Sequence, residues 1–187
     1  METSRLIRKI HMDCPLCDKT HEIEERKRLA TITLKGDKVT YEERFYFCAN
    51  AYEDENEFET GSITNANLLN ARNAYRVKHG LLTSDEIVAI RESYGLSQVD
   101  LARLLGWGEA TISRYESKAI QDEAYDTMLR FIKDNPLKAL EFLKKNAAKF
   151  TELKRAEVRE KIIDFPDISP PAPRKPGTKL VSKSSQI

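Results

Sequence analysis

Two kinds of hydrophobic pattern divide the chain. In the first 50 residues, β-branched and aromatic residues gather in two runs, 29–34 and 39–47, with Gly36-Asp37 between them. Such runs around a glycine-containing pair are typical of two strands joined by a tight turn. We therefore expect a β-hairpin in the N-terminal part of the chain.

From Asn65 onward, apolar residues recur at helical spacing. The first helix is expected over Asn65–His79, because Thr64 can cap its start and Gly80 can end it. This helix would link the N-terminal unit to the rest of the chain.

The segment that follows predicts five short helices in a compact domain. Thr83 and Glu86 have the spacing of a capping box, and Ser97 precedes a run that ends at Gly106. Proline is favoured at the first position of a helix, so Pro136 is expected to begin the fifth helix. The helices are expected over 83–95, 97–106, 109–118, 122–135 and from Pro136 onward.

The C-terminal end changes character again. A charged helix is expected over 147–165, whereas the prolines from Pro166 onward exclude regular structure in the tail. Residues 147–187 carry 9 basic against 5 acidic residues. We interpret the basic tail as solubilising, and contact with DNA phosphate is the alternative. Its basic residues are Arg174, Lys175, Lys179 and Lys183.

These elements predict an α+β chain with a small β-rich domain followed by an all-helical one. The expected divisions are a β-rich domain, a linker helix, a helical domain, a charged helix and a disordered tail. They fall at residues 1–62, 63–82, 83–146, 147–165 and 166–187. The acidic run 53–59 is expected to be a solvated connection, with docking of a basic partner as the alternative.

Composition narrows the class of protein. The 187 residues are 40% hydrophobic with a net charge of +1, so any contact with nucleic acid must come from a local patch. No apolar stretch approaches the roughly 20 residues of a membrane span, so we expect a soluble, cytoplasmic protein without membrane contact. Without a glycine-rich phosphate loop or a Ser-His-Asp arrangement, we expect neither an enzyme nor a small-molecule substrate.

The cysteines indicate a metal site. Cys14 and Cys17 have the Cys-x-x-Cys spacing of a zinc knuckle, and Cys48 can supply a third thiolate. His21 is the expected fourth ligand, and His11 is its rival. The alternative is a set of reduced, unliganded thiols with Cys48 buried at a strand end. We favour a structural Zn²⁺, because a β-unit this small needs a further stabilising element.

The segment Arg91–Glu116 resembles the helix-turn-helix of the Cro and phage-repressor (XRE) class. The resemblance rests on Leu96-Ser97-Gln98, Leu101-Ala102, Gly106 and Ile112-Ser113-Arg114-Tyr115-Glu116. It implies that Arg91 and Glu116 form a partly buried ion pair. It also implies core positions at Leu96, Leu101, Ala102, Leu105, Trp107 and Ile112.

In this class the second helix of the motif enters the major groove of DNA. Arg114 is the leading candidate for reading a base, since a guanidinium can bond guanine O6 and N7 together. The alternative for Arg114 is a solvated surface ion pair. Lys118 would reach phosphate, and Glu109 would need to accept a hydrogen bond from cytosine N4. The candidate DNA-binding residues are Gln98, Glu109, Ala110, Thr111, Arg114 and Lys118.

The whole layout, over about residues 10–146, resembles the MqsA-type (YgiT-type zinc finger) antitoxins of bacterial toxin–antitoxin modules. The resemblance implies a structural zinc domain that binds or accompanies a toxin, and a helix-turn-helix domain that dimerises on a palindromic operator. Arg114 matches the family's base-reading arginine, whereas Ala110 replaces the asparagine that accompanies it. The operator sequence therefore does not carry over.

Our first hypothesis is a sequence-specific, homodimeric DNA-binding repressor that is the antitoxin of a type II module and regulates its own operon. The second is a zinc-containing transcriptional regulator without a toxin partner. The third is a protein-binding adaptor that has lost DNA binding.

Overall fold

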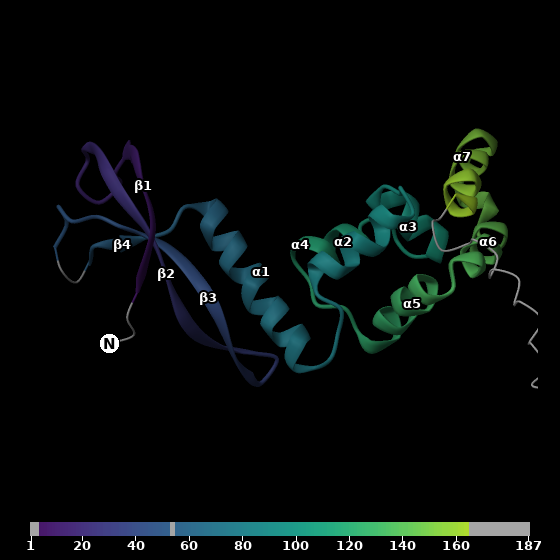
Figure 1. Cartoon of the computed structure of the whole chain (residues 1–187), viewed down its shortest axis with the longest axis horizontal. Coiled ribbons are helices and arrows are strands. Elements are labelled where there is room, and N and C mark those ends of the chain that lie inside the picture. Colours follow the sequence, from purple (N-terminus) through teal and green to yellow (C-terminus); the bar gives the residue numbers. More distant parts are fainter. Residues whose placement is uncertain (1–3, 53–54, 165–187) are drawn as a thin grey trace, which may run out of the picture.

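The computed structural model describes residues 4–52 and 55–164. Figure 1 shows a four-stranded sheet at one end, a long helix beside it, and a group of shorter helices at the other end. The predicted α+β class is confirmed. The predicted disorder of the tail 166–187 concerns residues outside the described part.

The sheet is antiparallel throughout, in the order β1-β2-β3-β4. Its strands are Arg5–Asp13 (β1), Thr20–Leu34 (β2), Asp37–Phe47 (β3) and Glu57–Phe58 (β4). The predicted hairpin is present as β2 and β3, but the turn was placed one residue too late. Lys35 and Gly36 form it with φ of 50° and 90°, and Asp37 already belongs to β3. Two positive φ angles match the twist that a two-residue hairpin requires.

The acidic residues Glu55, Glu57 and Glu59 are exposed, as expected, but their segment is more than a connection, which corrects that part of the expectation for residues 53–59. Glu57 pairs with Phe47 in the sheet, and its carboxylate accepts a 2.8 Å hydrogen bond from Arg28. Glu59 accepts a 2.7 Å hydrogen bond from Thr64. Partners for these charges draw this part of the run into the fold, whereas Glu53 and Asp54 lie outside the described residues.

Helix α1, Gly61–Lys78, begins four residues earlier than predicted, with Thr60 as N-cap in place of Thr64. It runs beside β3 where β4 does not reach. The buried side chain of Asn67 accepts from the backbone N–H of Arg44 (2.8 Å) and donates to its carbonyl (2.7 Å). Asn67 thus takes the place of a neighbouring strand and satisfies both backbone groups of Arg44.

Six further α-helices follow in the described residues. They are α2 (Ser84–Ser93), α3 (Gln98–Leu105), α4 (Thr111–Ser117), α5 (Glu123–Asp134), α6 (Pro136–Lys145) and α7 (Glu152–Ile163). The predicted capping box of Thr83 and Glu86 is confirmed. Helix α4 is shorter than the predicted 109–118, because residues 107–110 form the turn before it. The predicted charged helix is divided into a 3-10 turn, Ala147–Lys149, and α7.

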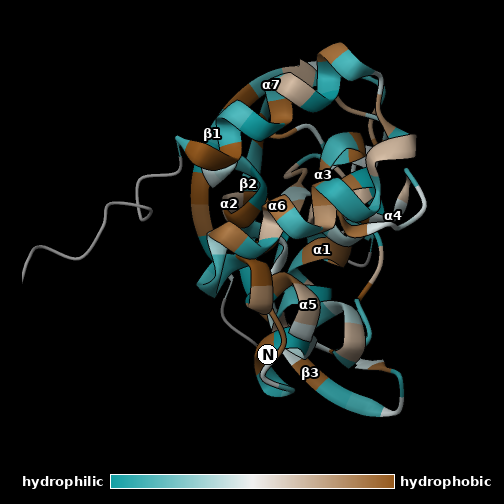
Figure 2. Ribbon diagram, turned by 90° about the vertical axis from the view of Figure 1, so that its right-hand side faces the viewer, coloured by the Kyte–Doolittle hydropathy of each residue, from teal (hydrophilic) through white to brown (hydrophobic). Residues whose placement is uncertain are grey.

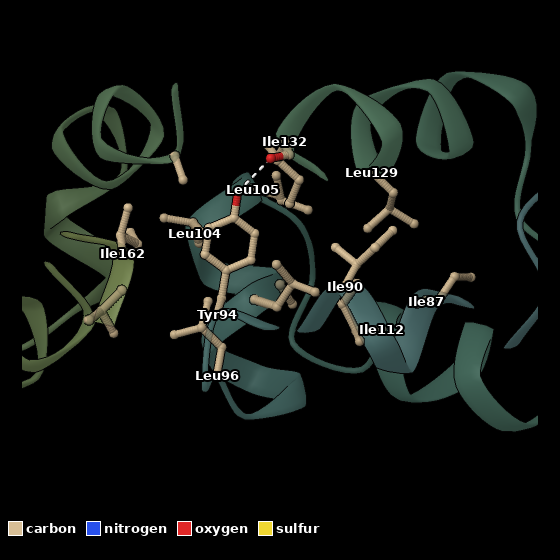
Figure 3. Close-up of a cluster of buried hydrophobic side chains, with 14 of the residues drawn as sticks. Ile87, Ile90, Tyr94, Leu96, Leu104, Leu105, Ile112, Leu129, Ile132 and Ile162 are labelled. Atoms are coloured by element: carbon tan, nitrogen blue, oxygen red, sulfur yellow. Dashed lines mark hydrogen bonds between the residues drawn. The ribbon is translucent and has the colours of Figure 1, made fainter. Parts of the chain in front are cut away.

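The main core lies among these short helices (Figure 3). Tyr94 is buried there and donates its hydroxyl to the carbonyl of Ile132. Val158 and Ile162 of α7 are fully buried in the same core, so α7 is an integral part of the helical half. These helices carry both hydrophobic and hydrophilic residues (Figure 2), as expected of helices that bury one face and expose the other.

A second, smaller core lies in the sheet half. It consists of Cys14, Ile23, Tyr46, Cys48 and Ile63. Over the described residues, none of the helices is both long enough and apolar enough to span a membrane.

Candidate metal centre and nucleic-acid interface

Three pieces of chain bring the cysteines together in the sheet half. Cys14 directly follows β1, His21 is the second residue of β2, and Cys48 directly follows β3. Between Cys14 and His21 the chain turns tightly, with Asp18 at φ 54° and a 3.0 Å hydrogen bond from its N–H to the carbonyl of Cys14. This turn points Cys17 back toward the strand ends.

The four donor atoms of Cys14, Cys17, His21 and Cys48 all lie within 4.8 Å of one another. Cys17 Sγ is 3.8 Å from Cys48 Sγ, and His21 Nε2 is 3.3 Å from Cys17 Sγ and 3.5 Å from Cys48 Sγ. In a tetrahedron with metal–sulfur bonds of about 2.3 Å, the sulfur atoms stand about 3.8 Å apart. The cluster therefore has the size to hold a metal ion.

Of the two histidines considered for the fourth position, His21 belongs to the cluster. His11 is exposed on β1, where it pairs with Glu22, and it is not part of the group. With four protein ligands the site is closed, which suits a structural role because no position is left for a reacting water.

The thiols differ in their protonation. Burial alone would raise the pKa of Cys14, but hydrogen bonds from His21 and from the backbone outweigh burial and lower that pKa to about 6. Burial and the neighbouring Cys14 thiol raise the pKa of Cys48. The lowered pKa favours the Cys14 thiolate, the form that binds a metal ion, and a metal held by all three sulfur atoms would require the other thiols to lose their protons as well.

In the helical half, α3 and α4 form two short helices joined by a tight turn. Gly106 ends α3 with φ 79°, and the N–H groups of Gly106 and Trp107 donate to carbonyls in the last turn of α3. Trp107 is half-buried and packs edge-on against Tyr125, with ring centroids 4.6 Å apart. A left-handed residue followed by a packed aromatic sets the angle at which α4 leaves α3.

A polar network holds α4 from one side. Glu116 of α4 accepts from Arg91 Nε at 2.7 Å, so the two residues expected to pair are in direct contact. The same carboxylate accepts a 2.7 Å hydrogen bond from Gln98 Nε2. Hydrogen bonding to Glu116 raises the pKa of Arg91. Gln98, a candidate for DNA contact, thus has its amide nitrogen engaged within the protein.

The other candidate residues lie around the start and the outer face of α4. Glu109 is exposed in the turn, where Arg103 of α3 donates to it at 2.6 and 2.9 Å. Ala110 is the N-cap of α4, Thr111 is its first residue, and Lys118 follows its end. We assigned no role to Arg103 from the sequence, since only the folded turn brings it to Glu109.

Arg114 differs from Gln98 and Glu109 in having no partner within the described part of the protein. It is exposed on α4, and within the described residues its guanidinium has no hydrogen-bond or ion-pair partner. The surface ion pair considered as its alternative role is thus absent from this part of the chain. An unpaired guanidinium on the second helix of such a motif is free to bond a ligand.

Residues 12–141 match the family model described as the antitoxin component of a bacterial toxin–antitoxin system, MqsA. The chain belongs to the MqsA antitoxin family. The matched segment contains both the cysteine cluster and the α3–α4 pair, whereas α7 lies beyond it. A comparison with curated proteins gives no match.

Proposed function

We propose that this MqsA-family protein is a sequence-specific DNA-binding repressor, the antitoxin of a toxin–antitoxin module that regulates its own operon. The observation that carries the proposal is Arg114, which is exposed on α4 and unpaired among the described residues, whereas the candidate residues Gln98 and Glu109 are engaged by bonds within the protein. An arginine in this place can read guanine in the major groove with two hydrogen bonds.

Two copies of the chain would bind together. A symmetric dimer presents two α4 helices about 34 Å apart, one helical turn of DNA, and so reads a palindrome. Lys118 would contact phosphate, which positions α4 without reading sequence. The free amide oxygen of Gln98 can only accept a hydrogen bond, so it would face a base donor such as adenine N6 or cytosine N4. Thr111 and Ala110 would face bases at the start of α4.

The bound metal is proposed to be Zn²⁺ in a structural role. Three thiolates and one imidazole are an ordinary zinc donor set, and a closed site leaves no position for catalysis. The sheet half that it organises is proposed to bind the toxin. Metal content by mass spectrometry of the purified protein would test this part, with one zinc per chain expected.

The DNA proposal is tested by selecting bound sequences from a random duplex pool with the full-length protein. We expect enrichment of a palindrome with wild type and its loss in Arg114→Ala. Arg159→Ala is the matched control, because Arg159 is exposed on α7 and also lacks a partner within the described residues. No enrichment by wild type at low salt would contradict the proposal and favour the protein-binding adaptor.

The proposed binding of a toxin is tested in a separate experiment. Co-expression with the product of the neighbouring reading frame should yield a complex whose formation requires the cysteine cluster. If no neighbouring product binds while the palindrome is still selected, the protein is a transcriptional regulator without a toxin.

A further inference from the structure

Arg76, near the end of α1, is the largest fully buried side chain among the described residues. Its Nε donates to Gln121 at 2.9 Å, and its Nη1 donates to Asn73 at 2.6 Å. Its Nη2 donates to the carbonyls of Tyr115 (2.5 Å) and Ala119 (2.6 Å). A single guanidinium thereby joins α1 to the C-terminal end of α4.

Burying this charge costs free energy unless its surroundings compensate. Burial lowers the pKa of Arg76 to about 10, so the group is still a cation at neutral pH. Within the described residues no carboxylate bonds it directly. The compensation comes from the carbonyls at the end of α4, where the helix dipole is negative, and from Gln121, which donates to Asp126 at 3.0 Å.

The bonds of Arg76 connect the two halves of the molecule. At its other end α1 is fastened to β3 by Asn67. Asn73, which accepts from Arg76, also accepts a 3.0 Å hydrogen bond from the N–H of Ser84 at the start of α2. The sheet, α1, α2 and α4 are therefore joined through one continuous set of hydrogen bonds.

The hydrogen bonds of Arg76 also hold α4, the helix that carries Arg114. The carbonyl of Arg114 accepts from the N–H groups of Lys118 and Ala119 at 2.7 and 2.6 Å, which closes the end of α4. Arg76 holds this closed end through Ala119 and Tyr115, while Glu116 holds α4 through Arg91. Arg91 belongs to the helical half, whereas Arg76 comes from the helix that packs on the sheet.

We propose that Arg76 is a positioning residue for DNA reading: it fixes the C-terminal end of α4 against α1. The same bonds make the sheet half and the helical half move as one rigid body. The inference rests on the proposed DNA binding and deepens it. A guanidinium is required because its planar fork serves four acceptors at once, which a lysine ammonium on a flexible stem cannot match.

The test uses full-length Arg76→Gln and Arg76→Lys. Arg72→Gln is the matched control, since Arg72 lies one turn earlier on α1 and has no side-chain partner within the described residues. Backbone ¹⁵N relaxation reports the tumbling time of each half. Affinity is measured on the duplex selected by wild type.

We expect one common tumbling time in wild type and Arg72→Gln, and two separate times in Arg76→Gln. Its DNA affinity should fall about tenfold, because the C-terminal end of α4 is released from α1. Arg76→Lys, which keeps the charge, should restore part of the affinity and tests the idea if Arg76→Gln does not fold. A common tumbling time and wild-type affinity in the folded Arg76 variants would overturn the inference. Failure of wild type to select any duplex would instead count against the proposed function.

Discussion

In the helical half, apolar side chains from α2 to α7 fill one continuous core, whereas the small core of the sheet half includes two of the cluster cysteines. Buried isoleucines and leucines stabilise a fold by their removal from water, without any partner of special chemistry. Buried thiols contribute little in this way and become costly when they ionise together. The two halves therefore obtain their stability from different sources.

The ion pairs of the sheet half contribute too little stability to replace the large apolar core that this half lacks. Arg8–Glu25, Lys27–Glu42 and Arg28–Glu43 lie across neighbouring strands, each with at least one partly exposed partner. Exposed ion pairs of this kind contribute about 0–1 kcal/mol each. A metal held by Cys14, Cys17, His21 and Cys48 would join three strand ends and the turn between β1 and β2, which is the stronger constraint. Metal loss should therefore act on the sheet half alone.

The largest effect is expected from metal removal. A chelator should unfold the sheet half while the thermal transition of the helical half stays nearly unchanged, because apparent metal-binding free energies of about 10 kcal/mol are folding free energy for such sites. Calorimetry with near-ultraviolet circular dichroism follows the two transitions. His21→Ala should reproduce the effect and His11→Ala should not. Melting of both halves by the chelator would contradict the comparison.

The converse experiment weakens the helical core. Ile162→Ala removes a fully buried side chain of α7 and should lower the free energy of unfolding of the helical half by about 3 kcal/mol. Metal content should remain at the wild-type level. Ile163→Ala is the neighbouring control, since Ile163 is 44% exposed and should change little. Equal effects of the two substitutions would show that α7 does not pack as described.

A smaller effect is expected at the ion pair behind α4. Glu116→Gln leaves the partly buried Arg91 with only the exposed Glu92, 3.7 Å away, as counter-charge and should cost about 2 kcal/mol of stability, below the value for fully buried pairs. Denaturant titration measures the loss, with the exposed Glu123→Gln as control. A loss no larger than that of the control would show that the pair does not hold α4.

The smallest effect is expected at the start of α2, where the connection from α1 enters the helical half. Thr83→Ala removes the capping box and should lower stability by about 1 kcal/mol. Thr83→Ser keeps the capping oxygen and should restore most of the loss. Thermal unfolding monitored at 222 nm distinguishes them, and identical curves for both variants would argue against the cap.

The features that could be predicted from the sequence are those that depend on neighbouring residues, on ligand chemistry or on a known motif. Thr83, Ser97 and Gly106 act within a few residues of their partners, so local rules locate them. The cysteine cluster follows from ligand chemistry, and the choice of His21 needed only a spacing argument. Arg91 and Glu116 are far apart in the chain, so their ion pair could be predicted only from the resemblance to a known helix-turn-helix motif.

Other features depend on contacts that no local pattern contains. Most of β1 is exposed, so its strand pattern is weak, and β4 is only Glu57–Phe58. The first residue of α1 could not be predicted, because it depends on where the chain leaves the sheet after β4. Arg76 reads as an ordinary surface residue of an amphipathic helix, and only the folded end of α4 shows that it is buried.

The most direct test of the account is DNA affinity on the selected duplex, measured for metal-loaded wild type, chelated wild type and Arg114→Ala. If DNA reading belongs to the helical half, and Arg76 keeps α1 on α4 after the sheet unfolds, chelation should change the dissociation constant less than about threefold, well within 1 kcal/mol. Arg114→Ala should weaken binding by about 1–3 kcal/mol, the value of a two-bond contact to guanine. Loss of binding on chelation, with Arg114→Ala unaffected, would contradict the account.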